Sequence, residues 1–215
     1  MLATDWVTVS SIATAAATLV LAVATFASVR SANRAARVAE RSLLAGLRPL
    51  LMPSRLDDQA QKVGFADDRW FVVPGSGAVC EVTPEAIYLS ASMRNVGSGI
   101  AVMHGWLLHT DVGRDARAAR EPSAIESFRR LTRDLYIAPG ELAFWQGAFR
   151  DPEEEAFTDA RRAIEGRQRF AIEILYGDAE LGRRVISLFS VSPRDDGGWL
   201  LSVARHWNVD GPAPR

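Results

Sequence analysis

An uninterrupted apolar run from Val7 to Val29 constrains this chain of 215 residues more than any other feature. The run contains no charged side chain. A helix rises about 1.5 Å per residue, so a segment of this length can cross a hydrocarbon core about 30 Å thick. We therefore expect an N-terminal transmembrane helix within residues 1–29, followed by a water-soluble remainder.

A cleaved signal peptide is the alternative interpretation of the same run. Signal peptides begin with a basic region, whereas the segment from Met1 to Trp6 contains no Lys or Arg. The apolar run also exceeds the usual core of about 7–15 residues. Both observations favour a membrane anchor that is retained.

The distribution of basic residues predicts the orientation of this anchor. Only Asp5 and the terminal amine precede the apolar run, whereas five arginines follow it closely: Arg30, Arg34, Arg37, Arg41 and Arg48. Basic residues stay on the cytoplasmic side, so the N-terminus is expected outside and the large C-terminal domain in the cytoplasm. These arginines are also expected to contact the anionic lipid headgroups of the bilayer.

The helix is predicted to continue beyond the membrane as a basic juxtamembrane stalk, residues 30–48. The sequence from Val29 to Leu47 has no proline and is rich in good helix formers, and Gly46 and Pro49 mark its end. A stalk whose arginine face is simply solvated and a stalk that packs on a partner helix both remain open.

Small residues on the same helix predict self-association. They alternate spacings of three and four residues and form a seam that includes Ala15, Thr18, Ala22, Val29 and Ala36. Small side chains allow two membrane helices to approach closely. We therefore expect a homo-oligomer; the alternative is that an alanine-rich helix simply has small residues on every face.

The remainder, residues 49–215, is predicted to be one soluble, mainly β domain. Apolar residues alternate with period two, for example at Ile87, Leu89 and Ala91, and turn residues recur at short intervals. This pattern is typical of an antiparallel β-sandwich of the immunoglobulin-like (Ig-like) kind. Strands are expected over residues 50–52, 70–73, 87–94, 101–110, 142–149, 169–176, 184–191 and 199–207.

One or two short helices are expected to interrupt the strands. Asp151 can cap a helix with Pro152 at its first position; Phe157, Ala160 and Ile164 then share a face, and Gly166 ends it. The stretch 122–133 has helical spacing but is equally compatible with an exposed connection. Residues 55–62 are polar and are expected to form a loop.

A glycine-rich segment contains Asn95, Gly97 and Gly99 and superficially resembles a dinucleotide-binding loop. The third glycine is absent, and a strand rather than a helix follows, so no helix N-terminus is available for a pyrophosphate. We therefore expect a structural turn in which the glycines supply positive φ or a bulge and Asn95 bonds the turn backbone. No cofactor is predicted.

Catalytic and metal-binding patterns are not recognisable in the sequence. His104 and His109 are an odd number of residues apart on one predicted strand, so they are expected on opposite faces; His206 is isolated. Cys80 is the single cysteine and forms neither an internal disulfide nor a zinc site with a second one. No catalytic, cofactor or metal residue is therefore predicted, although Trp145 and Trp207 are candidates for lining a groove.

Net charge differs between the two parts of the chain. Residues 1–48 carry a net charge of +3 and residues 49–215 a net charge of −4. The soluble domain has no basic stripe, so nucleic acid is not an expected partner.

The combination of features resembles a group of bacterial proteins. A single N-terminal membrane helix, a basic stalk ending in Arg48-Pro49, the turn from Asn95 to Ala101 and a Tyr176-Gly177-Asp178 turn are similar to those of bacterial single-pass membrane proteins of unknown function. The resemblance implies a cytoplasmic Ig-like β-sandwich and brings no catalytic residues.

The expected function is therefore a membrane-anchored, non-enzymatic interaction or scaffold module that holds a protein partner at the inner membrane face. Two alternatives from other classes remain. One is a hydrolase-type enzyme that uses Asp and His residues of the loops, and the other is a ligand sensor that signals through the stalk helix.

Overall fold

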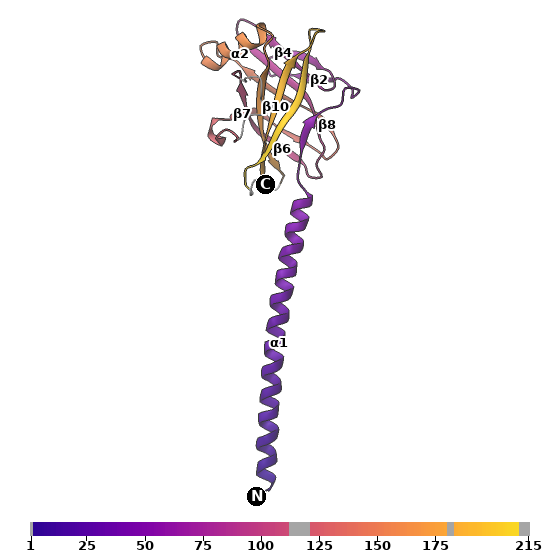
Figure 1. Cartoon of the computed structure of the whole chain (residues 1–215), viewed down its shortest axis with the longest axis vertical. Helices are drawn as coiled ribbons and strands as arrows, with labels where there is room; N and C mark the ends of the chain where they lie inside the picture. The colour runs from indigo at the N-terminus through magenta and orange to yellow at the C-terminus, as the bar shows by residue number, and fades with distance from the viewer. Residues whose placement is uncertain (1, 112–120, 180–182, 211–215) are drawn as a thin grey trace. The chain divides into compact units, whose positions relative to one another are not determined.

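The computed structural model describes residues 2–111, 121–179 and 183–210 and divides into two compact units, Met1–Gly46 and Leu47–Arg215. The first unit consists of helix α1 (Leu2–Gly46), drawn in indigo and purple in Figure 1. The apolar run and the predicted stalk therefore belong to one continuous helix. The second unit, hereafter the β domain, is treated by itself.

Helix α1 has the length and composition of a membrane-spanning segment. Its Trp6–Glu40 region contains a window apolar enough to cross a bilayer, and the side chains of this region are exposed. The hydroxyls of Thr14, Thr18 and Thr25 each donate a hydrogen bond of 2.8 Å to the carbonyl four residues earlier. These bonds satisfy hydroxyl groups that would find no water in a hydrocarbon core.

The β domain is mainly antiparallel, as the sequence predicts. Its described strands are β1 (Leu51–Pro53), β2 (Gln61–Gly64), β3 (Trp70–Val73), β4 (Gly77–Val82), β5 (Ile87–Asn95), β6 (Ala101–His109), β7 (Arg129–Ile137), β8 (Leu142–Phe149), β9 (Phe170–Asp178), β10 (Arg184–Pro193) and β11 (Trp199–Asn208). Its described helices are the short 3₁₀ helix η2 (Ile125–Ser127) and α2 (Glu155–Glu165).

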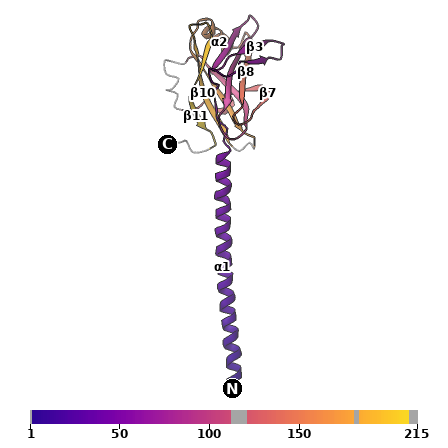
Figure 2. The same ribbon diagram turned by 90° about the vertical axis from the view of Figure 1, so that its right-hand side faces the viewer.

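Most strands belong to one sheet that folds over on itself into two layers. Strands β1, β4, β5 and β8 form one layer, and β11, β10, β9, β6 and β7 follow one another in the other. The layers are joined where β11 pairs with β4, at Trp199 with Ala78 and Leu200 with Gly77. Figure 2 shows β10 and β11 on one side of the domain and β8 on the other.

The core lies between these layers because alternate residues of each strand point inward. Trp106 of β6 crosses the core and meets Trp145 and Phe149 of β8 edge-on, with ring centroids 5.4 and 5.1 Å apart. Helix α2 lies at one end of the domain (Figure 1). The buried face of α2 includes the predicted Phe157, Ala160 and Ile164.

A separate hairpin of β2 and β3 covers the outer face of the first layer. Its Val63, Phe65 and Val73 form a second small apolar cluster with Ala86 and Tyr88. The expected loop over residues 55–62 is therefore wrong at its end, where Gln61 begins β2. Strand β4 was not expected either.

Two predictions around the helices are also wrong. The helical interpretation of residues 122–133 fails because only η2 is helical there and β7 begins at Arg129. Helix α2 begins at Glu155, later than the predicted start at Pro152. Asp151 instead accepts the Glu153 N–H at 3.0 Å in the turn that precedes the helix.

Candidate functional site at the open edge of the β domain

The predicted turn residue Asn95 is fully buried and uses its side-chain amide in four hydrogen bonds. Its Oδ1 accepts the N–H groups of Leu50 and Gly97 at 3.1 and 3.0 Å. Its Nδ2 donates to the carbonyls of Gly99 and Ile137 at 2.7 and 3.0 Å. Asn95 therefore joins its own turn, the start of the β domain and the end of β7.

The glycines of this turn serve close backbone approach rather than positive φ. The expectation of positive φ is wrong, because neither Gly97 nor Gly99 has a positive φ. Glycine is needed at these positions because a Cβ atom would collide with neighbouring backbone. A Cβ would lie 2.2 Å from the Arg48 carbonyl oxygen at Gly97 and 1.9 Å from the Leu47 carbonyl oxygen at Gly99. The N–H groups of Ser98 and Gly99 point at the Arg48 carbonyl, at 3.1 and 3.4 Å, and are thus unavailable to a phosphate.

A chain of hydrogen bonds connects polar groups of four strands, from buried Leu51 to half-buried His206. The Leu51 N–H donates to the Tyr176 hydroxyl at 3.3 Å, which lies 2.9 Å from Ser187 Oγ; Ser187 Oγ is 2.6 Å from His206 Nδ1. Burial lowers the pKa of His206 and raises that of Tyr176. The Ser187–His206 hydrogen bond forms with either partner as donor, because a neutral imidazole carries its proton on one of its two nitrogens.

This chain contains a hydroxyl beside an imidazole, the pair that activates a serine nucleophile. Ser187 is fully buried, however, and its hydroxyl is enclosed by Tyr176 and His206. A substrate carbonyl has no approach to Ser187 Oγ in this arrangement. The pair is therefore suited to holding β9, β10 and β11 together.

A second Ser–His pair lies on the outer face of β9. His109 Nε2 is 3.6 Å from the carboxylate of Glu173 and 3.5 Å from Ser123 Oγ, and the Ser123 N–H donates to Glu173 at 3.2 Å. Burial alone raises the pKa of Glu173, but the interactions of its carboxylate with His109 and Ser123 outweigh burial and lower the pKa. In a catalytic triad one imidazole nitrogen contacts the serine and the other contacts the carboxylate. Here Nε2 of His109 faces both Ser123 and Glu173.

The expected opposition of His104 and His109 is wrong because β6 contains a bulge. The register of β6 against β9 shifts between Met103 and Gly105, which makes His104 an extra residue. His104 Nε2 lies 2.9 Å from the Cβ position of Gly177, and His109 contacts Glu173, on the same strand. Gly177 and Glu173 are four residues apart and point to one face, so both histidines lie on that face.

The other candidates from the sequence do not line the β-domain pocket described below. Burial raises the pKa of the Cys80 thiol, which makes it a poor nucleophile or metal ligand. Trp145 is fully buried in the core rather than in a groove, and the Arg205 guanidinium lies 5.9 Å from the ring centroid of Trp207. Within the described ranges, no three His, Cys, Asp or Glu side chains are grouped as a metal site requires.

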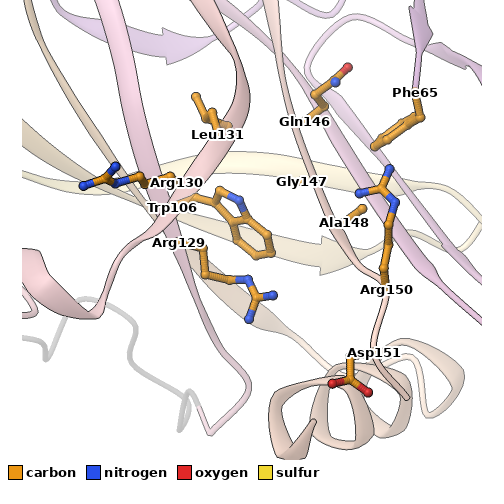
Figure 3. A pocket seen from close by; sticks show the side chains of 10 residues that line it. All are labelled: Phe65, Trp106, Arg129, Arg130, Leu131, Gln146, Gly147, Ala148, Arg150 and Asp151. Atoms are coloured by element: carbon orange, nitrogen blue, oxygen red, sulfur yellow. The ribbon is translucent and has the colours of Figure 1, made fainter. Parts of the chain in front are cut away.

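One pocket of about 340 Å³ lies in the β domain between β7 and β8. Figure 3 shows its walls, with Trp106 near the centre. The residues that line it combine cationic, aromatic and small side chains: Phe65, Trp106, Arg129, Arg130, Leu131, Gln146, Gly147, Ala148, Arg150 and Asp151. We call this cavity the edge pocket.

The edge pocket exists because two consecutive strands separate. In the pairings of the described residues, β7 pairs with β6 and β8 pairs with β5, and no pairing joins β7 to β8. The turn at Pro139-Gly140, with φ of 79° at Gly140, sends the chain from one layer to the other. Each strand thus keeps one open edge, and the two open edges border the pocket.

Arg129 forms the fixed part of the pocket wall. Its guanidinium lies 4.8 Å from the ring centroid of Phe149 and 5.6 Å from that of Trp106, and it forms an ion pair with Glu154. A cation on two aromatic faces that is also paired with a carboxylate is strongly held. Arg129 therefore shapes the cavity and leaves little capacity for a ligand.

The other two arginines have donors to spare. Arg150 is 3.7 Å from Asp67, beyond hydrogen-bond length, and the Tyr88 hydroxyl occupies the same oxygen of Asp67 at 2.5 Å. That hydrogen bond from Tyr88 lowers the pKa of Asp67. Arg130 is exposed and has no ion-pair partner in the described part of the chain. In Figure 3, Arg150 points toward Phe65 and Ala148, whereas Arg130 points away from Trp106.

A buried polar atom adds to the unused capacity of the pocket. Gln146 is 6% exposed, and its Oε1 has no hydrogen-bond partner among the residues that the structure describes. An unsatisfied buried acceptor costs about 1–3 kcal/mol. A donor carried by a ligand would satisfy this group.

The sequence did not predict the edge pocket, because the stretch that contains Arg129 and Arg130 was interpreted either as a helix or as an exposed connection. One signal was present: Leu131, Leu135 and Ile137 occupy odd positions, which is the alternation of a strand. Leu131 and Leu135 do pack against the core, and Ile137 is buried in it. The separation of β7 from β8 depends on tertiary pairing and has no local signal.

The predicted residues of the anchor lie along α1. Arg30, Arg34 and Arg37 are exposed on α1, as is Arg48 beyond it, while the Arg41 side chain lies outside the described residues. Three seam residues, Ala15, Thr18 and Ala22, line a shallow groove on the helix surface. Val29 and Ala36 are exposed further along the helix.

Comparison of the chain with protein-family models and with curated proteins finds no match.

Proposed function

We propose that this protein is a membrane-anchored, non-enzymatic interaction module that holds a protein partner at the inner face of a bacterial membrane. Helix α1 anchors it, its arginines contact anionic headgroups, and the β domain lies in the cytoplasm. The proposal includes an Ig-like character of the β domain, which is based on the resemblance of the sequence to bacterial single-pass proteins.

The chemistry of the edge pocket carries this proposal. The pocket combines arginine donors, aromatic surface and an unsatisfied amide oxygen, which are groups that bind a partner. Its lining carboxylate, Asp151, accepts the Glu153 N–H, and no nucleophile beside a base lines the cavity in the described segments. These groups favour recognition over bond cleavage.

A ligand sensor is the second candidate, and the Asn95 turn is the observation that favours it. Asn95, Gly97 and Gly99 hold the backbone of residues 47–50, which directly follow α1 in the chain. A change at this turn would thus act on the segment that leads to the anchor. The hydrolase alternative is disfavoured because Ser187 is enclosed and because His109 uses one nitrogen for both neighbours.

Orientation is tested with fusions to the C-terminus of the full chain. The positive-inside rule predicts that a fluorescent protein that matures only in the cytoplasm is bright when it follows Arg215. An active periplasmic phosphatase fused at the same position, together with a dark fluorescent fusion, would reverse the orientation and contradict the proposal.

Partner binding is tested by photocross-linking in intact membranes. A photoreactive amino acid at Leu131, in the edge pocket, is expected to give a discrete cross-linked protein. The same amino acid at Leu200, an exposed position outside the pocket lining, is the matched control and is expected to give none. Absence of a cross-linked protein at Leu131, or equal products at both positions, would contradict the proposal.

A further inference from the structure

We infer that the edge pocket binds an acidic peptide segment in extended conformation, which pairs with the open edge of β8 and places acidic side chains on Arg150 and Arg130. This inference rests on the proposed function and specifies the chemistry of the partner. Three observations lead to it: the open strand edges, the unused arginine donors, and the unsatisfied amide of Gln146.

The open edges favour an extended peptide over a compact ligand. Strand β8 has eight residues, and its pairings in the described chain are all with β5, so the side that faces β7 presents unpaired backbone groups. Such an edge is the usual template for an added strand, and main-chain hydrogen bonds supply the affinity. The edge borders the pocket at Gln146, Gly147 and Ala148.

The charges favour an acidic segment. The pocket lining includes three arginines and one carboxylate, that of Asp151. Arg129 is held by Glu154, but Arg150 lies 3.7 Å from its acidic neighbour Asp67 and Arg130 is exposed. Each guanidinium has five N–H donors in a planar fork that matches a carboxylate. The two arginines lie on opposite sides of the pocket, one on β7 and one after β8, so acidic side chains at alternate positions of an added strand, which share one face, can reach both.

The size of the cavity supports side-chain insertion. A volume of about 340 Å³ is at the lower end of the range of about 300–1,000 Å³ for ligand pockets. It accommodates a side chain and a few backbone atoms against Trp106 and Leu131, while the rest of the peptide follows the edge. A peptide N–H would also satisfy the Oε1 atom of Gln146.

The test measures binding of a fluorescein-labelled peptide of alternating valine and glutamate to the full chain in nanodiscs of neutral phosphatidylcholine. Fluorescence anisotropy is expected to show saturable binding. Replacing every glutamate of the peptide by glutamine is expected to weaken binding about tenfold or more. Two further peptides carry N-methyl groups on every second amide nitrogen, one at the odd and one at the even positions, and at least one of them is expected to bind about tenfold or more weakly. Arg150→Gln and Arg130→Gln are each expected to weaken it about tenfold. Arg194→Gln, at an exposed arginine paired with Asp196 outside the pocket, is expected to leave it unchanged.

Several outcomes would overturn the inference. Equal binding of the glutamine peptide excludes recognition of carboxylates, and equal binding of both methylated peptides excludes strand addition. Displacement of the peptide by glutarate at equal concentration would assign the pocket to a free small acid. If a protein is cross-linked at Leu131 but its capture is insensitive to Arg130→Gln and Arg150→Gln, the proposed function stands and this inference fails.

Discussion

Gly99 lies so close to the Leu47 carbonyl that a Cβ atom at this position would be 1.9 Å from the oxygen. This oxygen belongs to the backbone, and the hydrogen bond from the Gly99 N–H to the Arg48 carbonyl holds that backbone segment in place. Leu47 to Leu50 connect the anchor to the β domain in sequence. The close approach therefore fixes the first segment of the domain against the turn between β5 and β6.

Gly99→Ala is expected to lower the free energy of unfolding of the β domain by about 1–3 kcal/mol, because the methyl group forces the two backbone segments apart. Chemical unfolding of the full chain in detergent, followed by tryptophan fluorescence, measures the change. Gly46→Ala is the control, since a Cβ at Gly46 meets nothing within 4 Å. Equal stability of the two variants would show that the close approach is not needed.

Asn95→Asp is expected to destabilise the β domain by about 3 kcal/mol at neutral pH. The substitution keeps an acceptor for Leu50 and Gly97 but removes the Nδ2 donor to Gly99 and Ile137 and buries a charge. Burial raises the folded-state pKa of the new carboxyl above its unfolded value of about 3.9. The stability of the variant is therefore lost as the pH rises through the folded-state pKa of the introduced carboxyl. It is recovered as the pH falls toward the unfolded-state pKa.

Unfolding in urea at about pH 7.5 and about pH 5 measures this dependence. Asn208→Asp is the control, because Asn208 is half-buried at the end of β11. A stability loss of Asn95→Asp that is the same at both pH values would mean that the introduced carboxyl is not buried in its charged form.

Local sequence patterns were sufficient for much of the fold. Strands β3 (Trp70–Val73) and β8 (Leu142–Phe149) match the predicted ranges, and β9, β10 and β11 overlap the strands predicted over 169–176, 184–191 and 199–207. In each case a run rich in apolar residues is bounded by Gly or Pro, and both signals act within a few residues. The buried face of α2 follows from the same kind of local reasoning.

The features that the sequence did not reveal depend on contacts between distant residues. The bulge at His104 reverses the side that the following residues face, and nothing in the local alternation marks it. Arg129 and Arg130 belong to a strand because β6 pairs with it. The edge pocket forms because β7 pairs with β6 and β8 pairs with β5. These pairings depend on how the two layers assemble and not on the local sequence.

The hydrogen-bond chain that ends at His206 predicts a pH dependence of stability. Burial lowers the folded-state pKa of His206 from its ordinary value of 6.5, so the unfolded chain takes up a proton first as the pH falls. The contribution of His206 to stability is therefore fully present at pH values above its ordinary pKa. It is lost as the pH falls below that pKa toward the lower folded-state pKa. Thermal unfolding between about pH 7.5 and about pH 5.5 is expected to show this decrease.

His206→Asn separates this group from other titrating groups. The asparagine amide can still accept a hydrogen bond from Ser187 but does not titrate, so the decrease over this pH range is expected to become smaller. An unchanged decrease in His206→Asn would assign the effect to another group.

The seam of small residues on α1 predicts a homo-oligomer. Ala15, Thr18 and Ala22 line a shallow groove on the helix surface, and Val29 and Ala36 continue the same spacing. Small side chains let a second helix approach closely, and close packing drives helix association where lipid provides no hydrophobic force. Replacing Ala22 and Ala36 by leucine is expected to reduce cross-linked dimer in native membranes severalfold. Leucine at Ala16 and Ala35 adds the same volume off the seam and is expected to leave the dimer unchanged. Equal loss in both pairs of variants, or a monomer in the unsubstituted chain, would exclude this seam, because only a specific interface distinguishes one helix face from another.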